Sequence, residues 1–186
     1  MMSAAEALSP SCNFALMNYF ELFGFPEQFR IDKEALRRRF FELSRQYHPD
    51  YFAQSGDEVQ ADALEKAAQL NKAYKTLGND DERTRYLLEQ KGLLQADEKY
   101  ALAPDFLMEM MDLNEAVPEA LADEGAKERL LEQLQTWKTN IYAPVAQTLE
   151  ADSAAGLTEK ELLQVKEYYY RKKYLQRLAS QLGQKL

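Results

Sequence analysis

The spacing of apolar positions in the first half of the chain predicts a helical hairpin. From residue 33 onward, apolar residues recur at the i, i+4, i+7 and i+11 positions of one α-helical face. They are Leu36, Phe40, Leu43 and Tyr47. This helix must end at His48, because Pro49 disfavours the helical conformation of the residue before it. The same spacing returns after a polar loop and ends before Gly78. Its positions are Ala63, Ala67, Leu70, Tyr74 and Leu77. Two long helices joined by a short loop are expected to pack antiparallel.

Capping residues predict short helices on either side of this hairpin. Asn18 can cap a helix over residues 19–23, and Gly24 has the backbone freedom to end it. Asp32 is the expected cap of the first long helix. A further short helix is expected over residues 81–91, before a glycine.

Three amphipathic patterns in the second half of the chain predict a three-helix bundle. Their apolar positions are Phe106, Met110, Leu113 and Val117; Leu130, Leu134, Trp137, Ile141, Val145 and Leu149; and Val165, Tyr168, Leu175, Ala179, Leu182 and Leu186. Pro118 and Pro144 should interrupt the first two helices, and Thr158 with Glu161 forms a capping box at the start of the third. The predicted fold is all-α. Its parts are a tail over residues 1–17, a first domain over residues 18–92, a linker over residues 93–103 and the bundle over residues 104–186.

Charge and cysteine content narrow the classes of function. The 186 residues carry a formal net charge of −8, which disfavours nucleic acid and anionic membrane as partners. Cys12 and His48 are the single cysteine and histidine, too few soft ligands for a zinc or iron–sulfur site, so we expect no metal and no cofactor. No apolar run is long enough to span a bilayer. Residues 1–17 lack the basic start of a signal peptide, and we expect a cytoplasmic protein.

The loop of the predicted hairpin holds the tripeptide His48-Pro49-Asp50. Proline and aspartate are ordinary turn residues, so the tripeptide alone indicates only a turn. Two further segments, residues 19–24 (YFELFG) and residues 71–77 (NKAYKTL), occur with it in the same order and spacing as in a J domain. Together the three segments resemble a J domain over somewhat less than half of the chain.

The resemblance implies a co-chaperone. J domains stimulate the ATPase of chaperones of the seventy-kilodalton heat-shock family through their His-Pro-Asp loop. That role would fall here on Tyr47, His48, Pro49 and Asp50. The chain has Tyr51 where many J domains have lysine, which we expect to tune affinity.

The layout of the whole chain resembles one subclass, the HscB-type co-chaperone of iron–sulfur cluster assembly. In that subclass a J domain is followed at once by an acidic three-helix bundle of similar size. Some eukaryotic members add Cys-rich metal motifs, which this chain lacks, so it resembles the bacterial form. The resemblance implies two partners, a specialised seventy-kilodalton chaperone and the iron–sulfur scaffold protein, and no enzymatic activity of its own.

The hairpin helix also has a basic face. If its apolar stripe points to the core, Arg38 and Arg45, seven residues apart, lie together on the opposite side. Such a face is often merely solvated. In an acidic chain, beside a candidate binding loop, it can instead steer an acidic partner. The resemblance favours contact with the chaperone.

The first helix of the bundle has more apolar residues than one face can hold. Leu107, Met108 and Met111 point at least 100° away from the expected core stripe, on the side of Asp112 and Glu115. A bundle helix can bury more than one stripe, so packing is one explanation. A protein-binding patch is the other. In the HscB family this face contacts the scaffold protein, and the present chain has Met and Asp at two positions where Leu and Glu are more usual.

The resemblance adds Tyr174, on the last helix, to this scaffold-binding set. The neighbouring run over residues 168–174 is rich in tyrosine and basic residues, but its members divide between core and surface of a helix, which argues against a nucleic-acid site.

Two other classes of function fit the sequence less well. An enzyme would need a nucleophile and base, and the pair available is Cys12 with His48, of which Cys12 lies in a predicted tail. A helical adaptor with a vestigial J-like hairpin is opposed by the intact His-Pro-Asp sequence. Stimulation of a partner chaperone's ATPase separates the co-chaperone from both.

Overall fold

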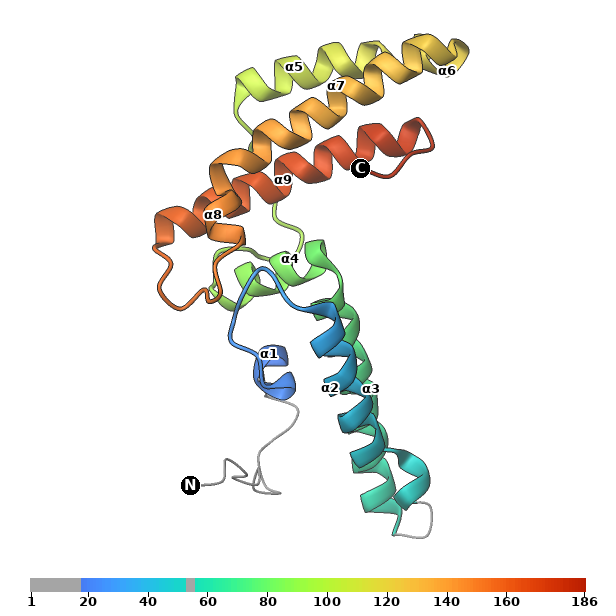
Figure 1. Ribbon diagram of the computed structural model, residues 1–186, viewed down its shortest axis with the longest axis vertical. Coiled ribbons are helices and arrows are strands. Elements are labelled where there is room, and N and C mark those ends of the chain that lie inside the picture. The colour runs from blue at the N-terminus through green and yellow to red at the C-terminus, as the bar shows by residue number, and fades with distance from the viewer. Residues whose placement is uncertain (1–17, 53–55) are drawn as a thin grey trace. The chain divides into compact units, whose positions relative to one another are not determined.

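The computed structural model describes residues 18–52 and 56–186, and within them all regular structure is helical (Figure 1). The predicted all-α class is therefore confirmed. The chain divides into two compact units, the first ending at Arg83 and the second running from Thr84 to Leu186. The predicted tail and Cys12 lie outside the described residues.

The first unit begins with the predicted short helix and hairpin. Its elements are α1 (Tyr19–Phe23), α2 (Lys33–Gln46), the 3-10 helix η2 (Pro49–Phe52) and α3 (Asp57–Gly78). The Asn18 side chain accepts a hydrogen bond from the Phe20 N–H, and Gly24 ends α1 with a φ of 71°. The Asp32 side chain accepts from two N–H groups in the first turn of α2. These caps satisfy helix-end donors that would otherwise lack partners, which is why local sequence located them.

Helices α2 and α3 lie side by side with the His-Pro-Asp loop at one end (Figure 1). The residues buried from the hairpin and α1 are Phe20, Leu22, Phe23, Leu36, Leu43, Ala63, Leu70, Ala73 and Leu77. Phe40 and Tyr47, counted in the predicted stripe, are only half-buried. Phe40 instead stacks on Tyr74 at the edge of the hairpin, with ring centroids 4.2 Å apart.

The chain continues from α3 into α4 (Asp80–Gln90), at whose start Arg83 is buried. Its guanidinium donates to the Phe29 carbonyl at 2.8 Å, to the Leu77 carbonyl and to the Asp80 carboxylate at 2.8 Å. A buried arginine is tolerated where its donors are satisfied in this way. The contacts fix the loop before α2 to the end of α3.

The second unit holds the predicted bundle, with its helices interrupted where prolines occur. Its elements are α5 (Pro104–Glu115), α6 (Val117–Ala122), α7 (Glu124–Tyr142), the 3-10 helix η3 (Ala143–Val145), α8 (Ala146–Leu149) and α9 (Glu159–Gln181). The break between α5 and α6 comes just before Pro118, and Pro144 lies in η3. The predicted capping box of Thr158 and Glu161 is present at the start of α9.

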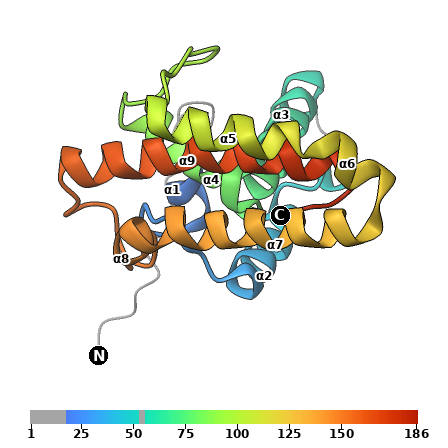
Figure 2. The same cartoon turned by 90° about the horizontal axis from the view of Figure 1, so that it is seen from above.

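One core joins α5, α6, α7 and α9, which run alongside one another in Figure 2. Its buried members are Phe106, Met110, Leu113, Val117, Ala120, Leu130, Leu134, Ile141, Leu175, Leu178, Ala179 and Leu182. On α9, the predicted position Tyr168 packs against this core but is only partly buried. Tyr169, which the prediction left out, is buried outside this core, beside residues 94–98.

Residues 93–103, predicted as a linker, contact α9 within the second unit. Lys166 is only 8% exposed, and its ammonium donates to the Leu93 carbonyl at 2.6 Å and to the Glu98 carboxylate. The rings of Tyr100 and Tyr170 stack with centroids 4.5 Å apart. Hydrogen bonding by Lys166 lowers the pKa of Glu98 below its usual value of 4.5. This segment is thus held by both polar and aromatic contacts.

Candidate functional site

The His-Pro-Asp loop places two exposed polar side chains at the end of the hairpin. The Tyr47 N–H bonds back to the Leu43 carbonyl as α2 ends, and Pro49 opens the 3-10 turn that follows. His48 Nδ1 accepts a hydrogen bond from the Asp50 N–H at 3.3 Å, and the Asp50 carboxylate lies 3.6 Å from the same nitrogen. A neutral imidazole that accepts at Nδ1 carries its hydrogen on Nε2. The loop can therefore offer a partner one donor and one carboxylate.

Aromatic residues on either side of the loop differ in exposure. Tyr47 is half-buried, and the Lys66 ammonium lies 5.8 Å from its ring centroid. Tyr51, the departure from the usual lysine, is largely exposed and meets His48 edge-on with centroids 6.0 Å apart. The Tyr51 ring thus places an exposed aromatic surface beside the loop.

The basic face of α2 lies open to solvent. Arg38 and Arg45 are both exposed, and Arg38 is 3.8 Å from the Glu34 carboxylate one turn earlier. Arg39 pairs with Glu42 at 3.0 Å. Exposed pairs of this kind contribute little to stability. The predicted role of Arg38 and Arg45 in binding the chaperone stays a prediction.

The surplus apolar residues of α5 lie outside the bundle core. Leu107, Met108 and Met111 are 36%, 66% and 58% exposed, whereas Phe106 and Met110 beside them are buried. The exposed side therefore alternates with the buried side as a 3.6-residue period requires. The sequence left open that these residues form a second buried face of the helix, and their exposure argues against it. Asp112 and Glu115 are also exposed on α5.

Tyr174 contacts the edge of the same core from α9. Its ring meets Phe106 edge-on with centroids 6.1 Å apart, and the Arg177 guanidinium lies 4.4 Å from its centroid. Tyr174 therefore contacts α5 through the buried Phe106. The binding role predicted for these six residues stays a prediction.

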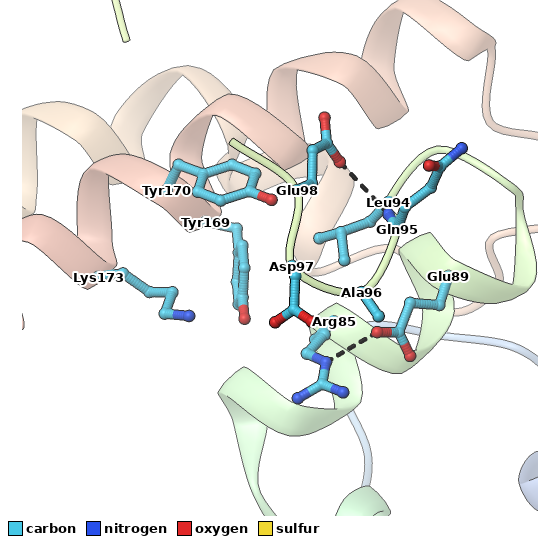
Figure 3. Close-up of a pocket in the computed structure, with 10 residues that line it drawn as sticks. All are labelled: Arg85, Glu89, Leu94, Gln95, Ala96, Asp97, Glu98, Tyr169, Tyr170 and Lys173. Atoms are coloured by element: carbon cyan, nitrogen blue, oxygen red, sulfur yellow. Dashed lines mark hydrogen bonds and ion pairs between the residues drawn. The ribbon is translucent and has the colours of Figure 1, made fainter. Parts of the chain in front are cut away.

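The second unit also contains a cavity of about 220 Å³ (Figure 3). It is lined by residues of α4, of the following segment and of α9. Arg85 pairs with Glu89 at 2.8 Å, and Glu98 accepts from the Gln95 N–H at 3.3 Å (Figure 3). Its lining carries both cationic and anionic side chains.

The described part of the chain contains no cluster of His, Cys, Asp and Glu side chains that could hold a metal ion. None of its helices is both long enough and apolar enough to cross a membrane.

Family models match both halves of the chain. A DnaJ domain model matches residues 18–86, and a model described as the HSCB C-terminal oligomerisation domain matches residues 102–183. The order of the two matches is the order that the sequence predicted.

Curated relatives carry the name of co-chaperone protein HscB homolog. The Vibrio campbellii protein is 35% identical over 142 residues, which is 76% of this chain and 82% of the relative. The Cupriavidus taiwanensis protein is 37% identical over 152 residues, or 78% and 86% of the two chains. A Vibrio vulnificus protein is 44% identical over 104 residues, and that match spans 55% of this chain but only 61% of the relative.

Solved structures agree with these matches. The HscB chaperone from Vibrio cholerae has a TM-score of 0.69 and 30% identity, covering 90% of this chain and 96% of its own. The human co-chaperone protein HscB has a TM-score of 0.74 and 25% identity, covering 95% and 83%. With both domains matched in order, and with relatives above 30% identity over most of the chain, the protein belongs to the HscB family of J-domain co-chaperones.

Proposed function

We propose that this protein stimulates the ATPase of a seventy-kilodalton heat-shock-type chaperone and delivers the iron–sulfur cluster scaffold protein to it, in the cytoplasm. The observation that carries the proposal is the His-Pro-Asp loop at the end of the α2/α3 hairpin, where the side chains of His48 and Asp50 are exposed and lie against each other. Side chains held locally but not buried are available for contact with a partner.

Stimulation follows if the loop binds better to the chaperone state that hydrolyses ATP than to the other states. A binding partner shifts such an equilibrium only by its difference in affinity for the two states. The Nε2 donor of His48 and the carboxylate of Asp50 supply directional contacts of this kind. The chain itself then acts as a regulator, and the chemistry takes place on the chaperone.

Delivery of the scaffold protein is assigned to the exposed face of α5 together with Tyr174. Flexible methionine and leucine side chains ringed by carboxylates suit an apolar patch on another protein. This face and the His-Pro-Asp loop lie in different units, so the two partners are assigned to separate surfaces of the chain.

The direct test is the steady-state ATPase rate of the chaperone with the full chain added. We expect the wild type to raise the rate, and His48→Gln and Asp50→Asn to abolish the increase while the helical circular dichroism signal stays the same. Asp152→Asn, which changes an exposed aspartate in the second unit, is the matched control and should stimulate like the wild type. Full stimulation by a well-folded Asp50→Asn variant would contradict the proposal and favour the adaptor alternative.

A further inference from the structure

Phe41 is an exposed aromatic residue in the middle of the basic face of α2. It is 52% exposed, although the neighbouring Phe40 is packed against Tyr74. Residues three and four positions apart adjoin on a helix surface. By this spacing Arg37, Arg38 and Arg45 are all neighbours of the Phe41 ring.

The fold makes little use of this ring. Its aromatic contacts among the described residues are with Phe40, at 5.9 Å between centroids and tilted by 57°, and with the Arg37 guanidinium, at 5.6 Å. A large aromatic side chain left half in water contributes less to the core than its size allows. An exposed aromatic ring surrounded by polar groups is typical of a residue that anchors a protein–protein interface.

The charges around the ring have one dominant sign. Helix α2 carries five basic and two acidic residues in a chain whose net charge is −8. Glu34 and Glu42 lie against Arg38 and Arg39, whereas no carboxylate in the described part of the chain pairs with Arg37 or Arg45. The surroundings of Phe41 are therefore cationic.

We propose that Phe41 is the apolar anchor by which this protein selects its partner chaperone, and that the chaperone surface it meets is an apolar recess bordered by carboxylates. The inference rests on the proposed function, in which the face of α2 contacts the chaperone. Complementary charge attracts the partner at long range, whereas a desolvated aromatic ring holds it after contact. A chaperone without the recess loses the second effect.

Binding kinetics distinguish the role of the Phe41 ring from that of the arginines around it. Rim charges act mainly on the association rate and make it dependent on salt. Loss of an apolar anchor acts mainly on the dissociation rate. Phe41→Gln should thus raise the dissociation rate at any ionic strength, and Arg37→Gln with Arg45→Gln should slow association and flatten its salt dependence.

The experiment measures association and dissociation rates of the full chain with the ATP-bound chaperone at several salt concentrations. For Phe41→Gln we expect dissociation at least tenfold faster and a tenfold higher concentration for half-maximal ATPase stimulation. Phe41→Leu keeps an apolar side chain and should stay within about threefold of the wild type. Leu64→Gln is the matched control, because Leu64 is a similarly exposed apolar residue on α3.

The result that overturns the inference is a Phe41→Gln variant that dissociates like the wild type or like Leu64→Gln. An equal loss in Phe41→Leu would also overturn it, since the effect would then not follow apolar contact. A wild-type chain that stimulates while Phe41→Gln is unaffected refutes the anchor alone. A wild type that neither binds nor stimulates refutes the proposed function as well.

Discussion

Removing Leu107 and Met111 together tests whether the exposed face of α5 binds the scaffold protein. Truncation of a buried Leu or Met to Ala typically costs about 2–5 kcal/mol, because apolar contacts are lost and a cavity remains. Leu107 is 36% exposed and Met111 is 58% exposed, so a substantial part of each residue stays in contact with solvent in the folded state. Alanine also has a higher helix propensity than either residue, which offsets part of the loss. We expect each substitution to lower the free energy of unfolding by less than about 1 kcal/mol.

The effect on binding should be larger than the effect on folding. Anchor residues at interfaces contribute more than about 1 kcal/mol each. Two of them together amount to about 2 kcal/mol, which weakens binding roughly thirtyfold. The helix provides its own control, because Met110, adjacent in sequence, is fully buried. Met110→Ala should lower the melting temperature of the bundle by roughly 8 °C or more if it costs about 2 kcal/mol, and leave the affinity of the folded fraction unchanged.

The assay pairs thermal melting of each variant with titration of the purified scaffold protein by calorimetry. Leu163→Ala, at an exposed apolar residue on α9, controls for loss of any surface hydrophobe. ATPase stimulation without scaffold should survive in the double variant, while the additional stimulation with scaffold should weaken. If the Leu107→Ala, Met111→Ala variant melts as early as Met110→Ala yet binds scaffold normally, these residues belong to the core and the proposed site is wrong.

Two further results are expected. Reversing Arg38 and Arg45 to Glu should slow association with the chaperone at least tenfold while changing dissociation less. High salt should reduce the difference in association rate between the wild type and this variant. Association rates insensitive to both charge and salt would refute steering by this face. Glu98→Gln should lower the melting temperature at pH 7. The lowered pKa of Glu98 means that its carboxylate stabilises the folded state at pH values above the usual pKa of 4.5. This stabilisation is lost as the pH falls through the folded-state pKa. Melting temperatures of wild type and Glu98→Gln should converge once the pH is below the lowered pKa of Glu98. A constant difference across pH would show that the bond to Lys166 is not the cause.

Sequence alone determined the helical class and several of the helix ends, although α3 continues through Gly78, before which the pattern predicted its end. Asn18, Asp32 and the capping box at Thr158 satisfy backbone donors a few residues away. A proline has no backbone N–H donor and therefore interrupts a helix. Both effects depend only on near neighbours in the chain. The His-Pro-Asp loop could be located for the same reason, since its position follows from where α2 must stop. The resemblance to a known family then supplied the expected partners, which composition and spacing could not.

Tertiary structure decided which side chains are buried at the margins of each stripe. Tyr169 rather than Tyr168 is buried, and Phe40 stacks on Tyr74 while Phe41 faces water. Burial of Lys166 was equally hidden, because its acceptors on residues 93 and 98 lie far away in sequence. Adjacent positions on a helix differ by only 100°, so a pattern leaves the boundary of a face undefined until the partner helices are in place. The scaffold proposal depends on the exposed face of α5. Which face of α5 is exposed was decided by the core that it shares with α7 and α9.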